Sequence, residues 1–324
     1  MIKPYCFLAL LLLIGCNPTA PIASDEDVIV VGGSTGGDSI IILPSIVTPK
    51  IPTLEELPIL RIISWNLQAF GPSKANNPEF MQVVDNVIGG YYDIVFFQEI
   101  RDSTGEAWKK LCSDFSKEYG YSCYISHRVG STQMKEQYGV LYLSEKVYPF
   151  LVSDENAPYV SFERPPLIID WQIRNADYKF TTVTVHIDPD KVREELESLE
   201  VTILRSGNVI IMGDLNADCD YYDETRKNAF TSNWAWVVPD YADTTVSNNT
   251  SCAYDRIILN ADAMREYGGS GLLNPEMITK EVSDHYPVTL VIVAEEQNAK
   301  PVVVRESAIS LSTLRCYKLI SSSL

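Results

Sequence analysis

The stretch that decides the fold is residues 209–216, which read Val-Ile-Ile-Met-Gly-Asp-Leu-Asn. Four apolar and mostly β-branched residues predict a short buried strand. The strand runs directly into a glycine, a carboxylate and a carboxamide. Because a strand end is a rigid support, polar groups placed there can be held accurately enough to bind or to react. We therefore expect a functional site at the ends of buried strands.

The same arrangement recurs along residues 59–296. Asn66 and Glu99 each follow an apolar run, His186 follows a third, and His285 lies just before a fourth. Any single polar strand end is usually a turn or cap residue, but two of the chain's three histidines are in this set. Carboxylates, carboxamides and imidazoles together suit a hard divalent ion and proton transfer at a phosphate. The predicted strands are residues 59–65, 93–97, 140–143, 167–169, 180–185, 209–212, 257–259 and 288–293.

Helical stretches lie between some of these strands. Apolar residues keep a helical spacing over residues 80–88, 108–115 and 192–203, and charges occupy the opposite face of the last stretch. Strands that alternate with helices in this way predict the α/β fold class.

The composition is that of a globular protein with an excess of acid. Of 324 residues, 43 are acidic and 26 are basic, which gives a formal net charge of −17. Hydrophobic residues make up 46% and charged residues 21%, so the chain is not disordered throughout. The acidic excess argues against a protein that coats nucleic acid through bulk charge, but it leaves room for a local basic or metal-lined cleft.

The N-terminus carries an export pattern. Lys3 precedes an apolar run over residues 5–14, which is too short to span a bilayer and is typical of a signal peptide. The run ends Leu-Ile-Gly-Cys at residues 13–16, which resembles the lipobox of bacterial lipoproteins and implies cleavage after residue 15 and lipidation of Cys16. A secretory signal with a chance cysteine is the alternative. We expect a lipid anchor in the membrane of the bacterial cell envelope, at the outer membrane or cell surface.

The chain divides into four parts on this interpretation. Residues 1–15 form the signal peptide, and residues 16–58, which contain clustered glycines and scattered prolines, form the lipid anchor and a linker. Residues 59–296 form the folded domain, and residues 297–324 form a C-terminal tail without a clear period.

Five cysteines remain once the signal peptide and Cys16 are set aside. An exported chain permits disulfides, and an odd number leaves at least one thiol free or paired between chains. These cysteines are Cys112, Cys123, Cys219, Cys252 and Cys316.

Five short motifs, taken in order, resemble those of the endonuclease/exonuclease/phosphatase superfamily, in its deoxyribonuclease I-like branch. They are Ser-Trp-Asn-Leu-Gln around Asn66, residues 98–102 (Gln-Glu-Ile-Arg-Asp), 213–219 (Gly-Asp-Leu-Asn-Ala-Asp-Cys), 252–256 (Cys-Ala-Tyr-Asp-Arg) and 283–287 (Ser-Asp-His-Tyr-Pro). The resemblance implies a four-layered α/β sandwich, in which two mixed sheets pack face to face with flanking helices and the active site lies at one edge. It also implies a disulfide between Cys219 and Cys252.

The resemblance further implies a metal site and a DNA-binding surface. Glu99 is the expected principal ligand of Mg²⁺, with Mn²⁺ as an alternative ion, and Asn66 and Asp284 complete the site. Mg²⁺ keeps several waters and needs only one or two protein carboxylates. A solvated strand end is the alternative for Glu99. Arg101 and Arg164 are expected to contact DNA and to supply the local positive charge that the chain as a whole lacks.

The remaining site residues handle the phosphate and the protons. A carboxylate that supports a histidine fixes its tautomer and favours the charged imidazole at neutral pH. Which imidazole is the base and which the acid stays open, and two buried core histidines are the alternative. The implied set is Asp214 at the attacking water, Asn216 at the phosphate or the nucleophile, His186 supported by Glu136, and His285 supported by Asp255.

Two features lie beside this pattern. Where the family has an aromatic residue that stacks in the minor groove, two positions before Glu136, this chain has Met134, which can pack against a sugar but cannot stack as tyrosine does. Asp243, Thr245 and Ser247 alternate their oxygens as a structural Ca²⁺ site does, and an ordinary polar loop is the alternative.

The function implied is a Mg²⁺-dependent endonuclease, expected to be a monomer, that cleaves DNA to 5′-phosphorylated products. A lipid headgroup phosphodiesterase of the same superfamily, resembling sphingomyelinase, is an alternative that membrane anchoring favours. The third hypothesis is a surface binding protein that keeps the fold but has no catalytic activity. Strand preference and any need for calcium do not follow from the sequence.

Overall fold

The computed structural model describes residues 58–131, 135–154, 162–174, 176–203, 207–223 and 233–294. The lipidation at Cys16, the signal peptide, the linker, the tail, Cys316 and Met134 lie outside these described residues and stay predictions. In the part of the chain that is described, no helix is long and apolar enough to cross a membrane.

Within the described residues, twelve strands form two six-stranded sheets. The first sheet has the order β11-β12-β1-β2-β4-β3 and the second has the order β5-β6-β7-β8-β10-β9. The first sheet consists of β1 (Ile59–Phe70), β2 (Ile94–Ile100), β3 (Tyr121–Ile125), β4 (Gln137–Leu143), β11 (Tyr267–Leu272) and β12 (Val288–Val293). The second consists of β5 (Val147–Ser153), β6 (Leu167–Ile173), β7 (Lys179–His186), β8 (Asn208–Asp214), β9 (Ala235–Trp236) and β10 (Asp255–Leu259).

Each sheet has one parallel strand pair among antiparallel neighbours. β1 pairs with β2 in parallel, and β7 pairs with β8 in parallel. The carboxyl ends of a parallel pair meet at the same edge of a sheet. The polar residues at the ends of β1 and β2 therefore lie together, and so do those at the ends of β7 and β8.

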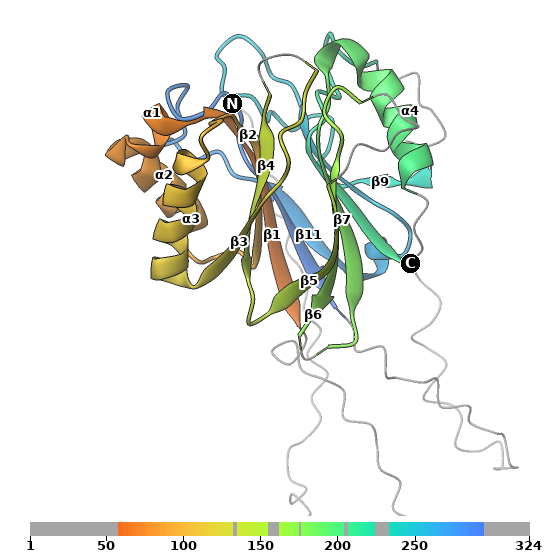
Figure 1. The fold of residues 1–324 in the computed structure, drawn as a ribbon. Coiled ribbons are helices and arrows are strands. Elements are labelled where there is room, and N and C mark those ends of the chain that lie inside the picture. Colours follow the sequence, from red (N-terminus) through yellow and green to blue (C-terminus); the bar gives the residue numbers. More distant parts are fainter. Residues whose placement is uncertain are drawn as a thin grey trace, which may run out of the picture. The chain divides into compact units, whose positions relative to one another are not determined.

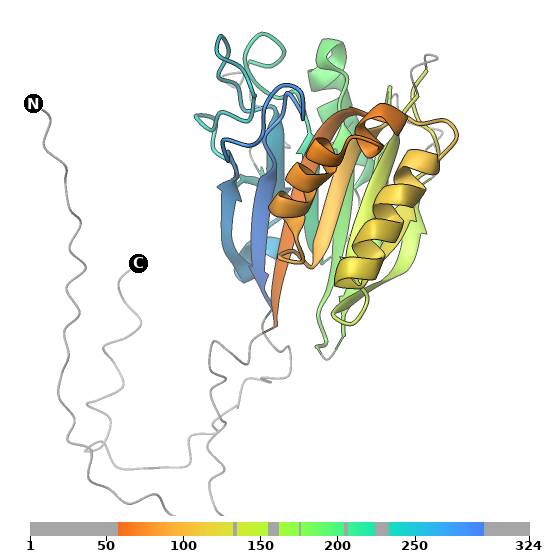
Figure 2. The ribbon, with the colours of Figure 1, turned by 90° about the vertical axis from the view of Figure 1, so that its left-hand side faces the viewer.

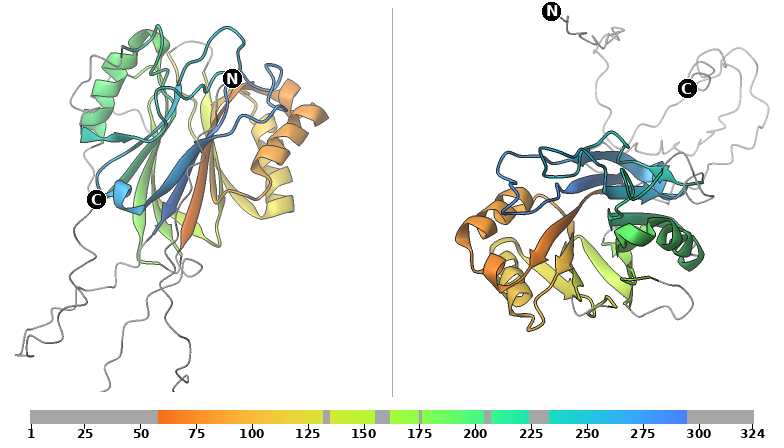
Figure 3. Two further views of the ribbon diagram at one scale, coloured as in Figure 1. Left: turned by 180° about the vertical axis from the view of Figure 1, so that it is seen from behind. Right: turned by 90° about the horizontal axis from the view of Figure 1, so that it is seen from above.

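The layers are held together by three buried apolar clusters. Phe96 and Leu290 of the first sheet pack with Trp171 and Met212 of the second in a core between the sheets. The outer face of the first sheet is covered by helices α2 and α3, and the outer face of the second by α4 (Figure 1). Figure 2 shows α2 and α3 side by side across their sheet, and the right-hand view of Figure 3 shows the layers from above. The predicted four-layered α/β sandwich is confirmed.

The three predicted helices are present with apolar faces toward the sheets. Asn77 caps α2 by accepting hydrogen bonds from the backbone amides of Glu79 and Phe80. α3 ends at Tyr119 and is capped by Gly120, whose φ of 79° is the left-handed conformation that favours glycine. The helices are α1 (Pro72–Ala75), α2 (Pro78–Ile88), α3 (Glu106–Tyr119) and α4 (Val192–Thr202), with short 3-10 turns η1 (Pro189–Lys191) and η2 (Ala263–Glu266).

Four strands have no counterpart among the eight predicted ones, namely β3, β5, β9 and β11. β11 has the sequence Tyr-Gly-Gly-Ser-Gly-Leu, which lacks alternating apolar residues. β5 is the last strand of its sheet, contains Pro149 and has a register shift between Pro149 and Leu151. Proline and bulges are typical of edge strands, where a missing backbone donor costs no ladder hydrogen bond.

Two disulfides are present in the described residues. Cys219 is bonded to Cys252, the pairing that the resemblance implied. Cys112 of α3 is bonded to Cys123 of β3, a pairing that the sequence left open. The second bond fastens a helix to the edge of the first sheet.

Candidate active site

Strand register places three ionisable residues of the second sheet in one row. Asp214 ends β8, and it is paired with His186 of β7 on one side and with Asp255 of β10 on the other. Gly213 precedes Asp214 with a φ of 141°, and a Cβ there would lie 2.0 Å from the carbonyl oxygen of Val185. Only glycine permits this close approach of β7 to β8, which brings the imidazole and the carboxylate together.

The first sheet contributes residues through a strained backbone. Glu99 of β2 has a φ of 60°, and Gln68 and Ala69 of β1 have φ values of 46° and 55°. Non-glycine residues rarely adopt this conformation, and it is concentrated at functional sites. The turn at Ala69 lets its amide donate to Glu99 Oε2 over 2.8 Å, and the amide of Gln68 donates to Asn66 Oδ1 over 2.8 Å. The backbone thus orients the two side chains.

The two histidines form matching pairs with buried carboxylates. His186 Nδ1 lies 2.6 Å from Glu136 Oε1, and His285 Nδ1 lies 2.7 Å from Asp255 Oδ2. In each pair one residue comes from the first sheet or its adjoining loops and the other from the second sheet. The pairs therefore form only when the two sheets are packed together.

Both imidazoles turn their second nitrogen toward the same carboxylate. His186 Nε2 lies 3.5 Å and His285 Nε2 lies 3.4 Å from Asp214 Oδ2. Asn66 Nδ2 donates to that oxygen over 3.0 Å and lies 3.3 Å from Glu99 Oε1. Asp214 therefore contacts side chains from both sheets.

The electrostatics favour the charged forms of the two imidazoles and of Asp214. Burial lowers the pKa of His186, but Glu136 and then Asp214 outweigh it, and the pKa lies above its usual 6.5. Burial also lowers the pKa of His285, but Asp255 and Asp214 hold it well above the usual 6.5. Burial raises the pKa of Asp214, but His285, His186 and the hydrogen bond from Asn66 bring it below its usual 3.8. Burial, in contrast, raises the pKa of Asp255 to about 6, although His285 lowers it.

The oxygen donors fit a divalent ion between Glu99 and Asp284. Asp284 Oδ1 is buried, accepts no hydrogen bond and lies 3.6 Å from His285 Nε2, so an unused carboxylate oxygen faces the site. Glu99 and Asn66 add a carboxylate and a carboxamide, which are ligands that Mg²⁺ accepts. Ligand atoms of Asp214, Asp255 and His285 also lie within 4.8 Å of one another and pair among themselves. The oxygens of Glu99 are paired as well, with Asn66 and Arg101. Either group could hold a divalent ion.

The three remaining predicted site residues differ in their contacts and exposure. They are Asn216, Arg101 and Arg164. Asn216 Nδ2 donates to the carbonyl of Ile187 over 3.0 Å, so its amide nitrogen is engaged by the backbone. Arg101 pairs with Glu99 Oε2 over 2.7 Å, and 29% of its side chain is exposed. Arg164 donates to the carbonyl of His186 over 2.8 Å and is only 15% exposed. Arg164 thus supports the His186 backbone, and Arg101 is the more accessible of the two arginines.

Several supporting residues escape sequence reasoning because they carry no motif of their own. Tyr138 accepts a hydrogen bond from the amide of His186 over 3.0 Å. Thr244 accepts from the amide of Asp255 over 3.0 Å. Lys74 donates three hydrogen bonds to the backbone carbonyls of Leu67, Gln68 and Val282. Only the general preference of Ser and Thr for backbone partners could have suggested any of them.

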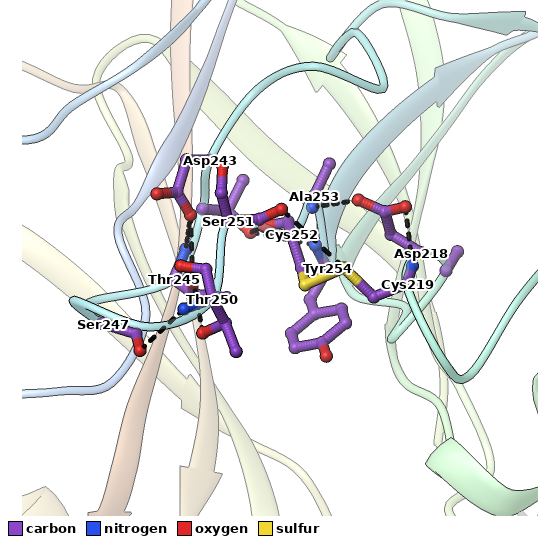
Figure 4. The surroundings of a disulfide bond; sticks show 12 residues. Asp218, Cys219, Asp243, Thr245, Ser247, Thr250, Ser251, Cys252, Ala253 and Tyr254 are labelled. Atoms are coloured by element: carbon purple, nitrogen blue, oxygen red, sulfur yellow. Dashed lines mark hydrogen bonds between the residues drawn. A yellow bond between two sulfur atoms is a disulfide. The ribbon is translucent and has the colours of Figure 1, made fainter.

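The Asp243 loop lies beside the Cys219–Cys252 disulfide (Figure 4). Asp243 Oδ1 accepts from both the amide and the hydroxyl of Thr245, over 3.1 and 2.7 Å, and Ser247 Oγ accepts from the amide of Thr250 over 3.2 Å. These bonds are those of a self-contained polar loop. Calcium binding by this loop stays a prediction.

Comparison with solved structures agrees with this architecture. An endonuclease/exonuclease/phosphatase from Bacteroides vulgatus superposes with a TM-score of 0.54 at 15% identity, over 73% of this chain and 99% of that one. A protein of the same description from Bacteroides thetaiotaomicron gives a TM-score of 0.51 at 16% identity, over 73% of this chain and 98% of that one. At such low identity the likeness shows the fold alone.

Sequence relatives are more similar. Deoxyribonuclease-1 of Gallus gallus is 31% identical over 264 residues, which are 72% of this chain and 93% of that protein. Deoxyribonuclease gamma of Rattus norvegicus is 31% identical over 258 residues, which are 71% of this chain and 83% of that protein. The model of the Endonuclease/Exonuclease/phosphatase family matches residues 63–285, from β1 to the second histidine of the site. As its ordered motifs predicted, the chain belongs to this family.

Proposed function

We propose that this protein is a divalent-metal-dependent endonuclease that hydrolyses phosphodiester bonds of DNA and leaves 5′-phosphorylated ends. The observation that carries the proposal is the convergence of two carboxylate-backed imidazoles on one oxygen of Asp214. In this hydrolysis water loses a proton, the 3′-oxygen gains one, and charge on the phosphoryl oxygens is stabilised. The side chains of the site offer groups for each of these tasks.

The roles of the residues follow from their charges. Asp214 is ionised at neutral pH because its pKa is lowered, so it can accept a hydrogen bond from the attacking water and orient it. The neutral imidazole takes the proton of the water at its Nε2, the water oxygen bonds to phosphorus, and the P–O3′ bond breaks. The imidazole that is protonated gives its Nε2 proton to the leaving 3′-oxygen, and Glu136 or Asp255 at Nδ1 keeps the ring oriented.

A divalent ion fits this chemistry. When bound, it stabilises negative charge on the phosphoryl oxygens. Glu99, Asn66 and Asp284 would hold it, because they offer oxygen ligands on the side of the site where Asp284 Oδ1 has no hydrogen-bond partner. Mg²⁺ is the expected ion, with Mn²⁺ as a substitute.

DNA is the proposed substrate because the similar proteins are named as deoxyribonucleases. A net charge of −17 gives no general attraction for a polyanion, so local cations must offset phosphate repulsion. Arg101 is accessible enough to contact a phosphate, whereas Arg164 acts through the backbone. We propose that the enzyme is a monomer.

We further propose that the enzyme is exported and anchored to the bacterial cell envelope through lipid on Cys16. The support is the lysine, the apolar run and the Leu-Ile-Gly-Cys sequence at the N-terminus. Two disulfides within the described residues agree with an oxidising compartment. Fractionation of cells that express the chain tests the anchor: a wild-type protein that is as soluble as Cys16→Ala contradicts it.

Nicking of supercoiled plasmid by the full chain tests the activity. We expect nicking with Mg²⁺, none with EDTA, and 5′-phosphates at the new ends. Glu99→Gln should reduce the rate by at least roughly 10²-fold at fixed Mg²⁺, because a metal ion supplies several kcal/mol. Glu118→Gln, which changes an exposed carboxylate of α3, serves as the matched control.

Each alternative predicts a different result. Release of phosphocholine from sphingomyelin without plasmid nicking would favour the lipid phosphodiesterase. DNA binding without any turnover at Mg²⁺ or Mn²⁺ would favour the non-catalytic binding protein. Nicking that persists unchanged in EDTA would remove the metal from the proposal.

A further inference from the structure

We propose that Lys74 is a positioning residue that clamps together the two segments holding the metal ligands, and so sets the affinity of the site for a divalent cation. The inference rests on the proposed metal-dependent function. Lys74 lies on α1, outside every motif of the sequence, and touches neither the imidazoles nor Asp214 among the described contacts.

The clamp consists of three hydrogen bonds from one amine. Lys74 Nζ donates to the carbonyls of Leu67 over 2.8 Å and Gln68 over 2.6 Å, both at the end of β1. It also donates to the carbonyl of Val282 over 2.7 Å, more than 200 residues further along the chain. An ammonium group has three protons, so all of its donors are used. The two segments are thereby joined through a single point.

The β1 end is oriented from both sides. Its amides at Gln68 and Ala69 donate to Asn66 and Glu99, the expected metal ligands, while its carbonyls at Leu67 and Gln68 accept from Lys74. This segment has positive φ at Gln68 and Ala69, which costs energy unless the surroundings hold it. The hydrogen bonds from Lys74 to the carbonyls of Leu67 and Gln68 stabilise this backbone conformation.

The second segment leads directly to the third ligand. Val282 is followed by Ser283, whose hydroxyl donates to the carbonyl of Asn66 over 2.7 Å, and then by Asp284. The amide of His285 donates to Ser283 Oγ over 3.1 Å. Lys74 and Ser283 are therefore two ties between the same segments, and both act on the spacing of Asp284 from Asn66 and Glu99.

A clamp and a simple positive charge predict opposite results. A fixed cation near a metal site repels a divalent ion, so its removal by Lys74→Met should strengthen metal binding if charge alone mattered. If Lys74 acts as a clamp, its removal frees the ligand segments and weakens metal binding. Loss of an outer partner of metal ligands typically weakens metal affinity by about 10–100-fold.

The experiment measures Mn²⁺ affinity of the full chain without DNA, by titration calorimetry, for wild type, Lys74→Met and Ser283→Ala. We expect about tenfold weaker Mn²⁺ binding in Lys74→Met and a change in the same direction in Ser283→Ala. In the nicking assay, the Mg²⁺ concentration for half-maximal rate should rise by a similar factor, while the rate at saturating Mg²⁺ changes much less.

Lys146→Met is the matched control. Lys146 Nζ lies 2.5 Å from Asp93 Oδ1, just before β2, at the other end of the strand that carries Glu99. This variant loses the same charge and one ion pair, and its Mn²⁺ affinity should equal that of wild type. If Lys74→Met does not fold, as judged by thermal melting, Lys74→Gln replaces it under the same criterion.

The outcomes distinguish a failure of the proposed clamp from a failure of the proposed metal-dependent function. A folded Lys74 variant that binds Mn²⁺ as tightly as wild type, or more tightly, overturns the clamp. A wild-type protein that neither binds Mn²⁺ nor nicks DNA contradicts the proposed function instead. An equal loss in Lys146→Met would show a general effect of charge or stability and would also overturn the clamp.

Discussion

The two imidazole sites are built alike but are charged unequally. His186 belongs to the second sheet and is supported by Glu136 beside the first, whereas His285 lies beside the first sheet and is supported by Asp255 of the second. Their Nε2 atoms lie at nearly equal distances, 3.5 and 3.4 Å, from Asp214. The geometry alone does not distinguish a base from an acid.

A third charge at each site makes the difference. Arg164 Nε lies 3.7 Å from Glu136 and lowers the pKa of His186, against the larger raising effect of Glu136. Asp284 lies 3.6 Å from His285 and raises its pKa further. Without a bound cation to offset Asp284, His285 therefore holds its proton to higher pH than His186. We infer that His285 is the imidazole that is protonated at neutral pH and that His186 is the first to become neutral.

The largest expected effect is that of removing either imidazole. His186→Ala and His285→Ala should each lower kcat at saturating Mg²⁺ by about 10²–10⁴-fold, the range of general acid–base catalysis. Because the two rings act on one carboxylate, the double variant should lose much less than the product of the two factors. His127→Ala is the control, since that ring is 79% exposed and pairs with Asp154. Normal rates in either active-site variant would refute the assignment.

Asp255→Asn should have an intermediate effect and change the pH profile. In the wild type, the rate should rise as His186 becomes neutral and fall as His285 loses its proton at higher pH. Removal of Asp255 leaves burial to lower the pKa of His285, so the alkaline limb should move to lower pH. Rates from about pH 4 to about pH 10 test this, with Asp170→Asn, another buried carboxylate of the second sheet, as control. An unmoved limb would contradict the role of Asp255.

The smallest expected effect is that of Arg164→Gln. The variant loses the cation beside Glu136, so the pKa of His186 should rise while that of His285 stays as it is. NMR titration of the ring resonances can follow both, with exposed His127 as an internal reference. If the two pKa values move together, the third charges do not set the difference between the sites.

Much of the fold could be predicted from the sequence because buried strands are continuous apolar runs. All eight predicted strands and all three helices are present, but β11 is rich in glycine and β9 has only two residues, so neither carries a periodic signal. Asp214 and His186 were found as strand ends. Glu136 and Asp255, in contrast, came only from the family resemblance, since their partners are fixed by the packing of one sheet on the other.

Lys74 shows what the sequence could not reveal. Its partners are backbone carbonyls, which are the same for every residue type, so no pattern of side chains marks it. The family resemblance implied that Arg164 contacts DNA, and this stays a prediction. In the structure its guanidinium donates to the His186 and Ile187 carbonyls, which no sequence pattern indicated. Both cases depend on three-dimensional contacts between distant segments.

The shape of β5 has a consequence for contacts between neighbouring molecules. Phe150 and Leu151 are 51% and 50% exposed on the outermost strand of the second sheet, where unpaired backbone groups could recruit a strand from a neighbouring molecule. The proline at 149 withholds one amide, and the irregular register beside it twists the edge out of line. These two features disfavour pairing of the exposed edge of the second sheet with a strand of a neighbouring molecule.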